Sequence, residues 1–474
     1  MFHLIDYITL SSSTCCNNTD DVQFLISLKF VSFMKILSLS VSIIALFTLT
    51  GCASQTKKLY NKNPAFYSYI SGSVTGNNID AKSFEEVYVT PASCQKTIIA
   101  LLSYKTLGVD YRYATQLYVP KVSGKSQAVV SFSGDPTFTS QNLASLLSRY
   151  KGKKIDIVLD ASKFQTPDYS PNMMIDDVGS NYSPPLSSMI IDENLISIVA
   201  NPSMIGQLAH VVVDPEYPFV SDVITNTDES CVKARWERDV IKVNGNINVQ
   251  DEVFEREVSP KDLDPYILDK LEAVKKTLGI SGKVKIVRDA VKLPGNLMLV
   301  DSVESKPLKE IIQEALKQSN NLVFDSLYLT IVNSQKDEPI QNWSEGYSVI
   351  KDLVKKHFDV DMQNALIVDG SGISRYNRLM PLSLFQILQK GYEDKDFLAS
   401  LAQPGEEGST MEKRAILGSN IRAKTGSMSS ISCLCGYKIG TNPKAFVVVA
   451  NSFAPPSVKM SEVIDEFIKS RVGK

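Results

Sequence analysis

One block of short alternating apolar runs interrupts the chain, and it constrains the possible folds more than any other feature. Between about residues 115 and 258 these runs include QAVVSFSG, IDIVLDA, HVVVD and DVIKVNGNINV, separated by Gly, Pro, Asn and Asp. Alternation with a period of two is typical of strands that bury one face. A block of roughly 140 residues is the size of one or two small domains. We therefore expect a β-rich insertion.

Helical patterns lie on both sides of this block. Apolar residues recur at three- and four-residue steps over residues 261–279 and again in KPLKEIIQEALKQSNNLVFDSLYLTIV. Such spacing indicates helices with one buried face. A further helix is predicted over residues 90–108, where Pro91 lies in or just before the first turn and Gly108 ends the helix.

The end of the chain changes pattern again. After Gly426 the strand-like runs SISCLCGYKI and AFVVVANSF precede an amphipathic helix over residues 461–471. This order of elements predicts an α/β sheet domain that is split by the insertion. The expected boundaries are 66–117 and 289–474 for the sheet domain and 118–288 for the inserted β-rich domain or domains.

Composition excludes some classes of function. The chain has 474 residues, of which 43% are hydrophobic and 22% charged, so it can bury a large core. Fifty Lys and Arg against 52 Asp and Glu leave a formal charge of -2. No bulk positive charge is available to attract nucleic acid, so we expect no nucleic-acid partner.

The N-terminal region has the pattern of a secretion signal. From Met34 the sequence reads MKILSLSVSIIALFTLTGCAS, with one Lys, a short apolar core and Leu-Thr-Gly-Cys ending at Cys52. This run is too short for a transmembrane helix, which needs about 20 residues. It resembles a bacterial lipobox, so Cys52 is the predicted lipidation site. Residues 1–51 are read as an upstream extension plus signal peptide, with Met34 as the expected start because residues 1–33 lack signal features.

The compartment follows from this signal. Residues 52–65 are short and polar and would tether the protein to its lipid. Ala53 follows the Cys where Asp would resemble an inner-membrane retention signal, so the outer membrane is favoured. We therefore expect a lipid-anchored protein of the bacterial cell envelope that faces the periplasm and meets the membrane through this lipid alone. A buried helix with a chance Gly-Cys remains the alternative.

Cysteine and histidine give no sign of a metal site. Four of the seven Cys remain after residue 52, and two of the three His. Cys433 and Cys435 would share one face of a strand, where a mutual disulfide is geometrically poor. Cys94 and Cys231 show no partner by spacing. No metal-ligand pattern is present, which argues against a zinc hydrolase, so we predict neither a metal nor another cofactor.

A hydroxyl and an amine lie one helical turn apart in TPASCQKTIIALLSYKTLG. Ser93 and Lys96 would share a helix face, which brings the amine within reach of the hydroxyl. Serine is a weak nucleophile until a base takes its proton, and no His lies near Ser93 in the sequence. Burial lowers the pKa of a lysine, so Lys96 could serve as this base. The positive end of the helix dipole would also favour negative charge at Ser93.

Spacing alone does not establish this chemistry, because Ser-x-x-Lys occurs elsewhere in the chain, for example from Ser348 to Lys351. Two companion motifs support this interpretation. Ser319-Asn320-Asn321 follows in a helical region, and Lys424-Thr425-Gly426 is predicted to open a strand. Ser-x-x-Lys, Ser-x-Asn and Lys-Thr-Gly in this order mark penicillin-recognising serine enzymes.

These motifs resemble those of the class C low-molecular-mass penicillin-binding proteins, which are D-alanyl-D-alanine carboxypeptidases and endopeptidases. PASCQK is similar to the family's Pro-Ala-Ser-Thr-Gln-Lys, and VDGSGISRYN (Val368–Asn377) to its Asp-Gly-Ser-Gly-Leu-Ser-Arg segment. Gly134-Asp135-Pro136 and the stretch from Tyr182 to Asn194 resemble its inserted region. The resemblance covers about residue 65 to the C-terminus. It implies the β-lactamase/transpeptidase-like fold, an antiparallel sheet with helices on both faces.

The resemblance also implies roles for the motif residues. Ser93 would be the acylated nucleophile and Lys96 its base. Ser319 would relay a proton toward the leaving D-alanine and Lys96, and Asn321 would hold the peptide carbonyl of the substrate. Peptidoglycan stem peptides are the implied substrates, and β-lactam antibiotics the implied inhibitors.

The third motif would complete the site. Lys424 and Thr425 would meet the terminal carboxylate of the substrate. The backbone N–H groups of Ser93 and Ser427 would form the oxyanion hole. Gly426 would leave room for the substrate to lie along the strand.

We expect roles for two further residues and note two departures from the family's motifs. Arg375 would face a diaminopimelate carboxylate, although a loop salt bridge would equally account for it. Asp177 would meet the ammonium group of that side chain, but a solvated surface acid is the favoured alternative because Asp176 allows a slip of one residue. Asn320 stands where the family more often has Asp. Cys94 replaces the usual Thr, with small-residue packing as its expected role and a rival thiol nucleophile as the alternative.

Two other functions remain open at this point. A serine β-lactamase would share Ser93, Lys96 and Lys424, but the sequence offers no clear dedicated base for deacylation. A non-catalytic lipoprotein that binds the cell wall would have no need of the intact motifs. The sequence does not separate carboxypeptidase from endopeptidase action, since both pass through the same acyl-enzyme.

Overall fold

The computed structural model describes residues 65–121, 126–289, 293, 296–452 and 460–472. The predicted signal peptide, Cys52 and the tether up to residue 64 lie outside these residues. Residues 65–474 form one compact unit. In the described part of this unit, no helix combines the length and apolarity that crossing a bilayer requires.

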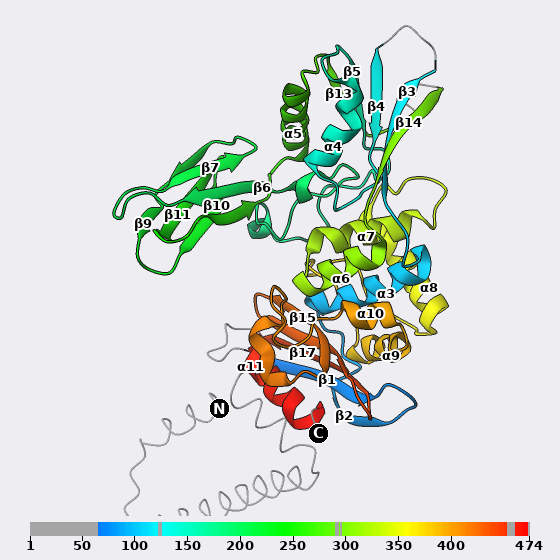
Figure 1. Ribbon diagram of the computed structural model, residues 1–474. Helices are drawn as coiled ribbons and strands as arrows, with labels where there is room; N and C mark the ends of the chain where they lie inside the picture. Colours follow the sequence, from blue (N-terminus) through cyan, green and yellow to red (C-terminus); the bar gives the residue numbers. More distant parts are fainter. Residues whose placement is uncertain (1–64, 122–125, 290–292, 294–295, 453–459, 473–474) are drawn as a thin grey trace, which may run out of the picture. The chain divides into compact units, whose positions relative to one another are not determined.

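A five-stranded antiparallel sheet carries the Lys-Thr-Gly motif (Figure 1). Its faces are set by the two-residue period of its strands. Ile70 belongs to the large buried cluster shared with the helices, whereas the neighbouring Tyr69 packs its ring against Phe467 of the C-terminal helix, 4.5 Å between ring centroids. Helices therefore cover both faces, and the predicted fold class is confirmed. The strand order is β15 (Ile421–Met428), β16 (Ile431–Lys438), β17 (Lys444–Ser452), β1 (Ala65–Ser73), β2 (Ile79–Ser83).

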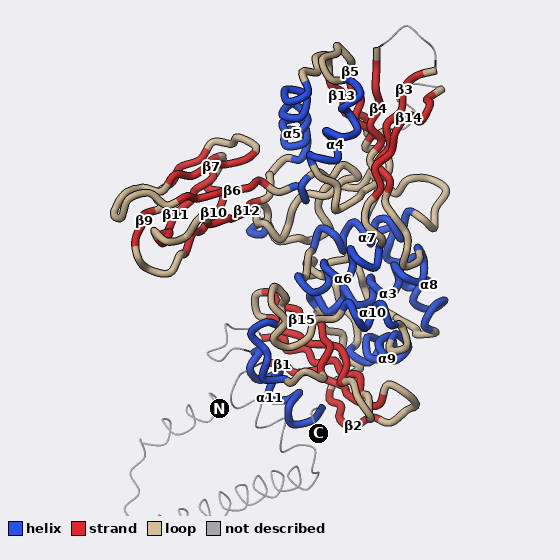
Figure 2. The backbone as a smooth tube through the Cα atoms, in the orientation of Figure 1, coloured by secondary structure: helices blue, strands red, loops and turns tan. Residues whose placement is uncertain are grey.

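The helices between the sheet and the insertion pack on one another around α3, and α9 also packs on the sheet (Figure 2). The predicted helix at residues 90–108 is present as a 3-10 turn followed by α3, and Gly108 ends it as predicted. The predicted C-terminal helix is present as α11 with a following π-helix at Ile468–Val472. The elements are the 3-10 turn η2 (Ala92–Gln95), α3 (Lys96–Leu107), α6 (Leu308–Gln318), α7 (Asn321–Asn333), α8 (Gly346–Phe358), α9 (Pro381–Gly391), α10 (Lys395–Ser400) and α11 (Met460–Phe467).

The described residues between α3 and α6 form three further sheets and two α-helices, α4 (Ser140–Leu147) and α5 (Leu263–Leu278). Helix α4 connects two parallel strands, β4 and β5. The alternating pattern did not predict α4, although Thr139 and Asn142 form a capping box at its start. The first sheet has the strand order β13 (Val284–Val287), β5 (Asp156–Asp160), β4 (Gln127–Ser131), β3 (Ala114–Pro120), β14 (Leu297–Glu304). The second has the order β12 (Phe254–Val258), β6 (Ile196–Asn201), β7 (His210–Asp214). The third has the order β10 (Cys231–Glu237), β11 (Val240–Asn248), β8 (Phe219–Ser221), and β9 (Ile224–Asn226) also pairs with β11.

The pairing of β3 with β14 bears on the domain boundaries. These two strands are antiparallel neighbours in one sheet, with Ala114 opposite Glu304. The sheet thus takes in residues on both sides of the predicted boundaries at 117 and 289. Strand pairing favours an inserted region that starts near residue 114 and ends near residue 304, and the division into domains stays a prediction.

Candidate active site

Ser93 lies in the 3-10 turn η2, directly before α3. The preceding Ala92 is fully buried and has a left-handed φ of 44°, an uncommon conformation for a residue with a side chain. This turn presents Ser93 to a cavity of about 340 Å³. The same cavity is lined by other predicted site residues, namely Asp177, Ser319, Asn321, Arg375 and Ser427.

Lys96 is fully buried, and its Nζ has three oxygen neighbours. They are Ser93 Oγ at 2.8 Å, Asn321 Oδ1 at 2.6 Å and Ser371 O at 2.6 Å. The two carbonyl oxygens can only accept hydrogen bonds, whereas the Ser93 hydroxyl can also donate. A neutral amine has two N–H groups and one lone pair. When the two N–H groups bond the carbonyls, the lone pair is left facing Ser93, as a general base requires.

The surroundings favour this neutral form. Burial, followed by the positive charge of Lys424, lowers the pKa of Lys96 to about 7, against the opposing effect of Asp325 and Asp369. Burial, followed by the charge of Asp369, raises the pKa of Asp325 to about 8. A carboxyl group that would stabilise an ammonium ion is thus itself biased toward its neutral form. The predicted neutral Lys96 is therefore consistent with both shifts.

The Ser-x-Asn motif lies where α6 ends and α7 begins. Ser319 has a left-handed φ of 68° at the end of α6, and Asn321 is the first residue of α7. The amide of Asn321 is oriented at both ends, because its Nδ2 donates to Tyr182 O at 2.7 Å while its Oδ1 accepts from Lys96. Ser319 lines the cavity, and its part in proton relay stays a prediction.

Lys424 lies in the middle of β15, not at its start. The prediction that the triplet opens a strand is therefore wrong. The strand begins at Ile421, and the alternately buried Ile421 and Ala423 already belong to it. Lys424 is 1% exposed, its Nζ donates to Thr425 O at 2.8 Å, and burial lowers its pKa to about 8. Thr425 Oγ1 lies 2.7 Å from Thr410 Oγ1.

Two glycines let the sheet and a loop approach the turn of Ser93. A Cβ on Gly426 would lie 2.3 Å from Cys433 Sγ and 2.9 Å from Ser93 N. A Cβ on Gly372, which has a φ of +84°, would lie 2.1 Å from Ala92 O. Gly426 thus has a packing requirement against the turn that contains Ser93, which the sequence did not reveal. Its predicted role of leaving room for substrate stays a prediction.

A buried carboxylate that the motifs did not indicate organises the loop beside Lys96. Asp369 accepts hydrogen bonds from Gly372 N at 2.8 Å, Ser374 N at 2.7 Å and Asn377 Nδ2 at 2.8 Å. These bonds fix the loop whose Ser371 O contacts Lys96. The segment Val368–Asn377 had been identified by resemblance, but no role had been assigned to its Asp.

A second missed carboxylate lies on α7. Asp325 accepts from Gly370 N at 2.9 Å and Ser371 N at 2.7 Å, so it holds the same loop from the other side. It follows Asn321 by four residues and therefore lies on the same helix face. That spacing is a signal from which sequence reasoning could have found it.

Arg375 and Asp177 both line the cavity of Ser93. Arg375 Nη1 donates to Ser429 O at 3.0 Å, and within the described part of the chain it makes no ion pair. Asp177 Oδ1 accepts from Tyr182 OH at 2.8 Å, and Asp177 rather than Asp176 lines the cavity. The roles of Arg375 and Asp177 toward a substrate stay predictions.

The thiol of Cys94, next to Ser93, is buried. Cys94 is inaccessible, and its Sγ donates to Lys424 O at 3.4 Å. Burial raises the pKa of the Cys94 thiol well above its usual value, which suppresses the reactive thiolate. The geometry therefore favours packing as its role. Cys433 and Cys435 are also free, as predicted from their spacing.

A match to a family model shows which family the chain belongs to. The model of the D-Ala-D-Ala carboxypeptidase 3 (S13) family matches residues 69–468. The chain belongs to this family. The predicted family and enzyme class are confirmed: this S13 enzyme is a serine D-Ala-D-Ala carboxypeptidase/endopeptidase that acts on peptidoglycan. This enzyme class differs from both alternatives, a β-lactamase and a non-catalytic protein that binds the cell wall, and the lipid anchor stays a prediction.

Individual relatives agree with the family. The S13 enzyme is 24% identical over 419 residues to the D-alanyl-D-alanine carboxypeptidase DacB of Haemophilus influenzae, covering 81% of this chain and 85% of the relative. It is 24% identical over 444 residues to the D-alanyl-D-alanine carboxypeptidase of Actinomadura sp. (strain R39), covering 84% and 80%. The crystal structure of penicillin binding protein 4 (dacB) from Haemophilus influenzae aligns with a TM-score of 0.73 at 23% identity, covering 88% of this chain and 98% of that one.

Among the described residues of the S13 enzyme, no group of three or more His, Cys, Asp and Glu is placed to hold a metal ion.

Proposed function

We propose that Ser93 is the nucleophile of the S13 enzyme and Lys96 its general base. The observation that carries this proposal is the trio of oxygens around Lys96 Nζ, which aims a neutral amine's lone pair at Ser93 Oγ. Lys96 takes the hydroxyl proton while Ser93 Oγ bonds to the carbonyl carbon of the penultimate D-alanine. The C–N bond to the last residue then breaks, and the leaving amine receives a proton relayed through Ser319.

Deacylation uses the same groups, with water in place of the leaving amine. Water attacks the ester on Ser93, gives a proton to Lys96 and releases the shortened stem peptide, and the serine oxygen regains its hydrogen. The backbone N–H groups of Ser93 and Ser427 are proposed to stabilise the oxyanion in both steps. This assignment is supported by the position of Ser93 and Ser427, which line the same cavity.

The remaining polar groups are proposed to bind the substrate. Lys424 and Thr425 would meet the terminal carboxylate, and Asn321 would donate its second Nδ2 hydrogen to a peptide carbonyl. Arg375 and Asp177 would meet the carboxylate and the ammonium group at the end of a diaminopimelate side chain. Their support is that both line the cavity of Ser93.

β-Lactams are the proposed inhibitors. A crystal structure of the Haemophilus protein contains a novel β-lactam and aligns with this chain at a TM-score of 0.68. A β-lactam offers Ser93 a strained amide carbonyl in place of the D-alanine peptide. The ring nitrogen stays attached to the acyl group, so the adduct should persist.

The proposed location is the periplasmic face of the outer membrane. The support lies in the sequence, where the signal from Met34 ends at Cys52 and Ala53 follows. Mass spectrometry of the mature N-terminus would test it. A diacylglyceryl group on Cys52 is expected, and an unmodified N-terminus elsewhere would contradict the anchor.

The catalytic assignment is tested with labelled penicillin and a pentapeptide that ends in D-Ala-D-Ala. Wild-type protein is expected to form a long-lived adduct on Ser93 and to release D-alanine, and Ser93→Ala to do neither. Ser348→Ala is the matched control, because the exposed Ser348 begins another Ser-x-x-Lys, on α8. Wild-type protein that forms no adduct and releases no D-alanine would refute the assignment. Mass spectrometry of muropeptides before and after incubation would show whether terminal D-alanines or crosslinks are cut.

A further inference from the structure

A turn of unusual backbone conformation lies in the inserted region, directly before β6. Asp192, Glu193 and Asn194 have φ values of 49°, 55° and 53°, so three consecutive residues with side chains are left-handed. Each such residue costs about 1 kcal/mol or more relative to ordinary backbone. A turn of this kind persists only where its surroundings hold it.

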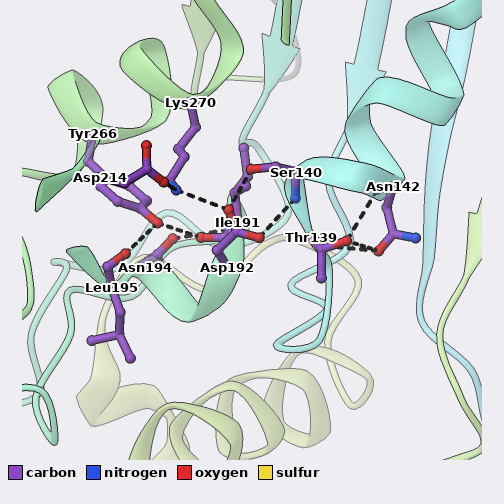
Figure 3. A network of polar contacts seen from close by, with 10 residues as sticks. All are labelled: Thr139, Ser140, Asn142, Ile191, Asp192, Asn194, Leu195, Asp214, Tyr266 and Lys270. Atoms are coloured by element: carbon purple, nitrogen blue, oxygen red, sulfur yellow. Dashed lines mark hydrogen bonds and ion pairs between the residues drawn. The ribbon is translucent and has the colours of Figure 1, made fainter. Parts of the chain in front are cut away.

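The first residue of the turn is held by its carboxylate. Asp192 accepts hydrogen bonds from Ser140 N at 2.9 Å and from Ser140 Oγ at 2.5 Å, at the start of α4. It also forms an ion pair with Lys270 of α5 at 3.2 Å. Figure 3 shows Ser140 and Lys270 on either side of Asp192.

The third residue is held by its amide. Asn194 Oδ1 accepts from Ile191 N at 3.1 Å, and its Nδ2 donates to Pro185 O at 2.9 Å. Tyr266 OH lies 3.0 Å from Ile191 O and 2.9 Å from Leu195 O, so it is within hydrogen-bonding distance of the carbonyls on both sides of the turn (Figure 3).

The middle residue is directed away from these contacts. Glu193 Oε2 accepts a hydrogen bond from Asn320 Nδ2 at 2.6 Å. The other end of the Asn320 amide caps α7, since Oδ1 accepts from Val323 N at 3.1 Å. Both ends of the amide of Asn320 are therefore fixed, one by its own helix and one by the inserted region.

Asn320 is the central residue of the Ser-x-Asn motif. On one side of it lies Ser319, in a left-handed conformation, and on the other Asn321, whose Oδ1 contacts Lys96 Nζ. A shift of this turn by a few tenths of an ångström would lengthen the Asn321–Lys96 bond and turn the lone pair of Lys96 away from Ser93.

We propose that Glu193 is a positioning residue, which the strained turn Asp192–Asn194 presents to Asn320 so that Asn321 stays on the general base. The inserted region thereby contributes to catalysis at a distance from the reacting atoms. Tyr182 O, which holds Asn321 Nδ2, is a second contact of the same kind. This inference rests on the proposed roles of Lys96 and Asn321.

The first test compares variants of Glu193 by the rate of acylation with labelled penicillin. Glu193→Ala removes the acceptor and is expected to lower the acylation rate constant about tenfold, with little change in the concentration for half-saturation. Glu193→Gln keeps an acceptor oxygen and should stay within about twofold of wild type. Glu257→Ala is the matched control, since Glu257 lines the same cavity of about 600 Å³ as Glu193. Equal rates for Glu193→Ala and Glu257→Ala would overturn the proposal.

The second test does not depend on removing a side chain from the strained turn. Asn320→Asp keeps the cap of α7, because a carboxylate also accepts from Val323 N, but it places two carboxylates face to face. We expect acylation to fall about tenfold or more at neutral pH. The double variant Asn320→Asp with Glu193→Gln should recover most of the rate, since the new amide can donate to the new carboxylate. A single variant with full activity, or a double variant without recovery, would overturn the proposal.

The proposed function and the positioning role of Glu193 can be refuted separately. A wild-type protein that is not acylated would refute the proposed function. A wild-type protein that is acylated, with Glu193→Ala unimpaired, would refute the positioning role alone. Thermal unfolding of every variant shows that the rates compare folded proteins.

Discussion

Replacing Asn321 by Asp should move the pH dependence of acylation. The Oδ1 atom of the half-buried Asn321 lies 2.6 Å from Nζ of the fully buried Lys96. An Asp at this position would place a negative charge against the amine and favour the ammonium form. An opposite charge at such a distance shifts a pKa by about 1 to 3 units. We take a shift of about 2 units, which carries the pKa of Lys96 from about 7 to about 9.

The magnitude follows from the neutral fraction of Lys96. With a pKa of about 7, half of the lysine is neutral at pH 7, so acylation by the wild type rises through this pH and levels off above about pH 8. With a pKa of about 9, about one molecule in a hundred is neutral at pH 7, so the rate falls about fiftyfold. Because the base is the deprotonated form, the loss is present below the raised pKa and disappears as the pH rises through it.

The assay is stopped-flow acylation with a fluorescent penicillin from about pH 6 to about pH 10. Asn321→Ala is the control, because it removes the carbonyl acceptor without adding charge. It should lower the rate while leaving the midpoint near that of the wild type. An Asn321→Asp profile with the wild-type midpoint would refute the assignment of Lys96 as the base.

Three other changes have expected outcomes. Lys96→Arg keeps a permanent positive charge in place of the base, so no penicillin adduct should form while the thermal unfolding transition is retained; an adduct would exclude Lys96 as the base. Gly372→Ala, with a Cβ 2.1 Å from Ala92 O, should lower the free energy of unfolding by on the order of 2 kcal/mol or more, measured in urea, and an unchanged midpoint would contradict the close contact. Asp369→Leu would leave several buried N–H groups without an acceptor and should cost about 3 kcal/mol or more by the same measurement, whereas a wild-type midpoint would show that the loop does not depend on them.

The part of the site that is local in sequence could be predicted. Ser93 and Lys96 are one helical turn apart, and a helix brings such residues together without help from the rest of the chain. The order of the motifs then indicated which distant segments meet them. The cavity that contains Ser93, Ser319, Asn321 and Ser427 agrees with that reading.

The groups that support this site depend on contacts that no local pattern encodes. Ser371 meets Lys96 through a backbone carbonyl, so its side chain carries no signal for the contact. Asp369 and Asp325 read as ordinary acidic residues until the fold brings both carboxylates to the loop beside Lys96. Glu193 lies far from Asn320 in sequence, and only the packing of the inserted region brings the two side chains within 2.6 Å.

The fold shows the same division. Period-two alternation predicted the strand-rich insertion, but α4 was hidden in it because the helix is short: Leu143, Leu146 and Leu147 supply only one repeat of the helical spacing. Lys-Thr-Gly was predicted to open a strand, but Lys424 comes three residues after the first residue of β15, Ile421. The register shows β15 pairing from Ile421 opposite Lys438, so tertiary pairing rather than composition determines where the strand begins.

The most direct test of the general base is the pKa of Lys96 itself. Protein labelled with ¹³C at the lysine ε-carbon can be titrated by NMR, with Lys96→Arg to assign the resonance. A midpoint near 7 is predicted, well below those of the surface lysines. A midpoint at or above the ordinary lysine value of about 10.4 would contradict the account, because the amine would then be charged when it is required to take the proton of Ser93.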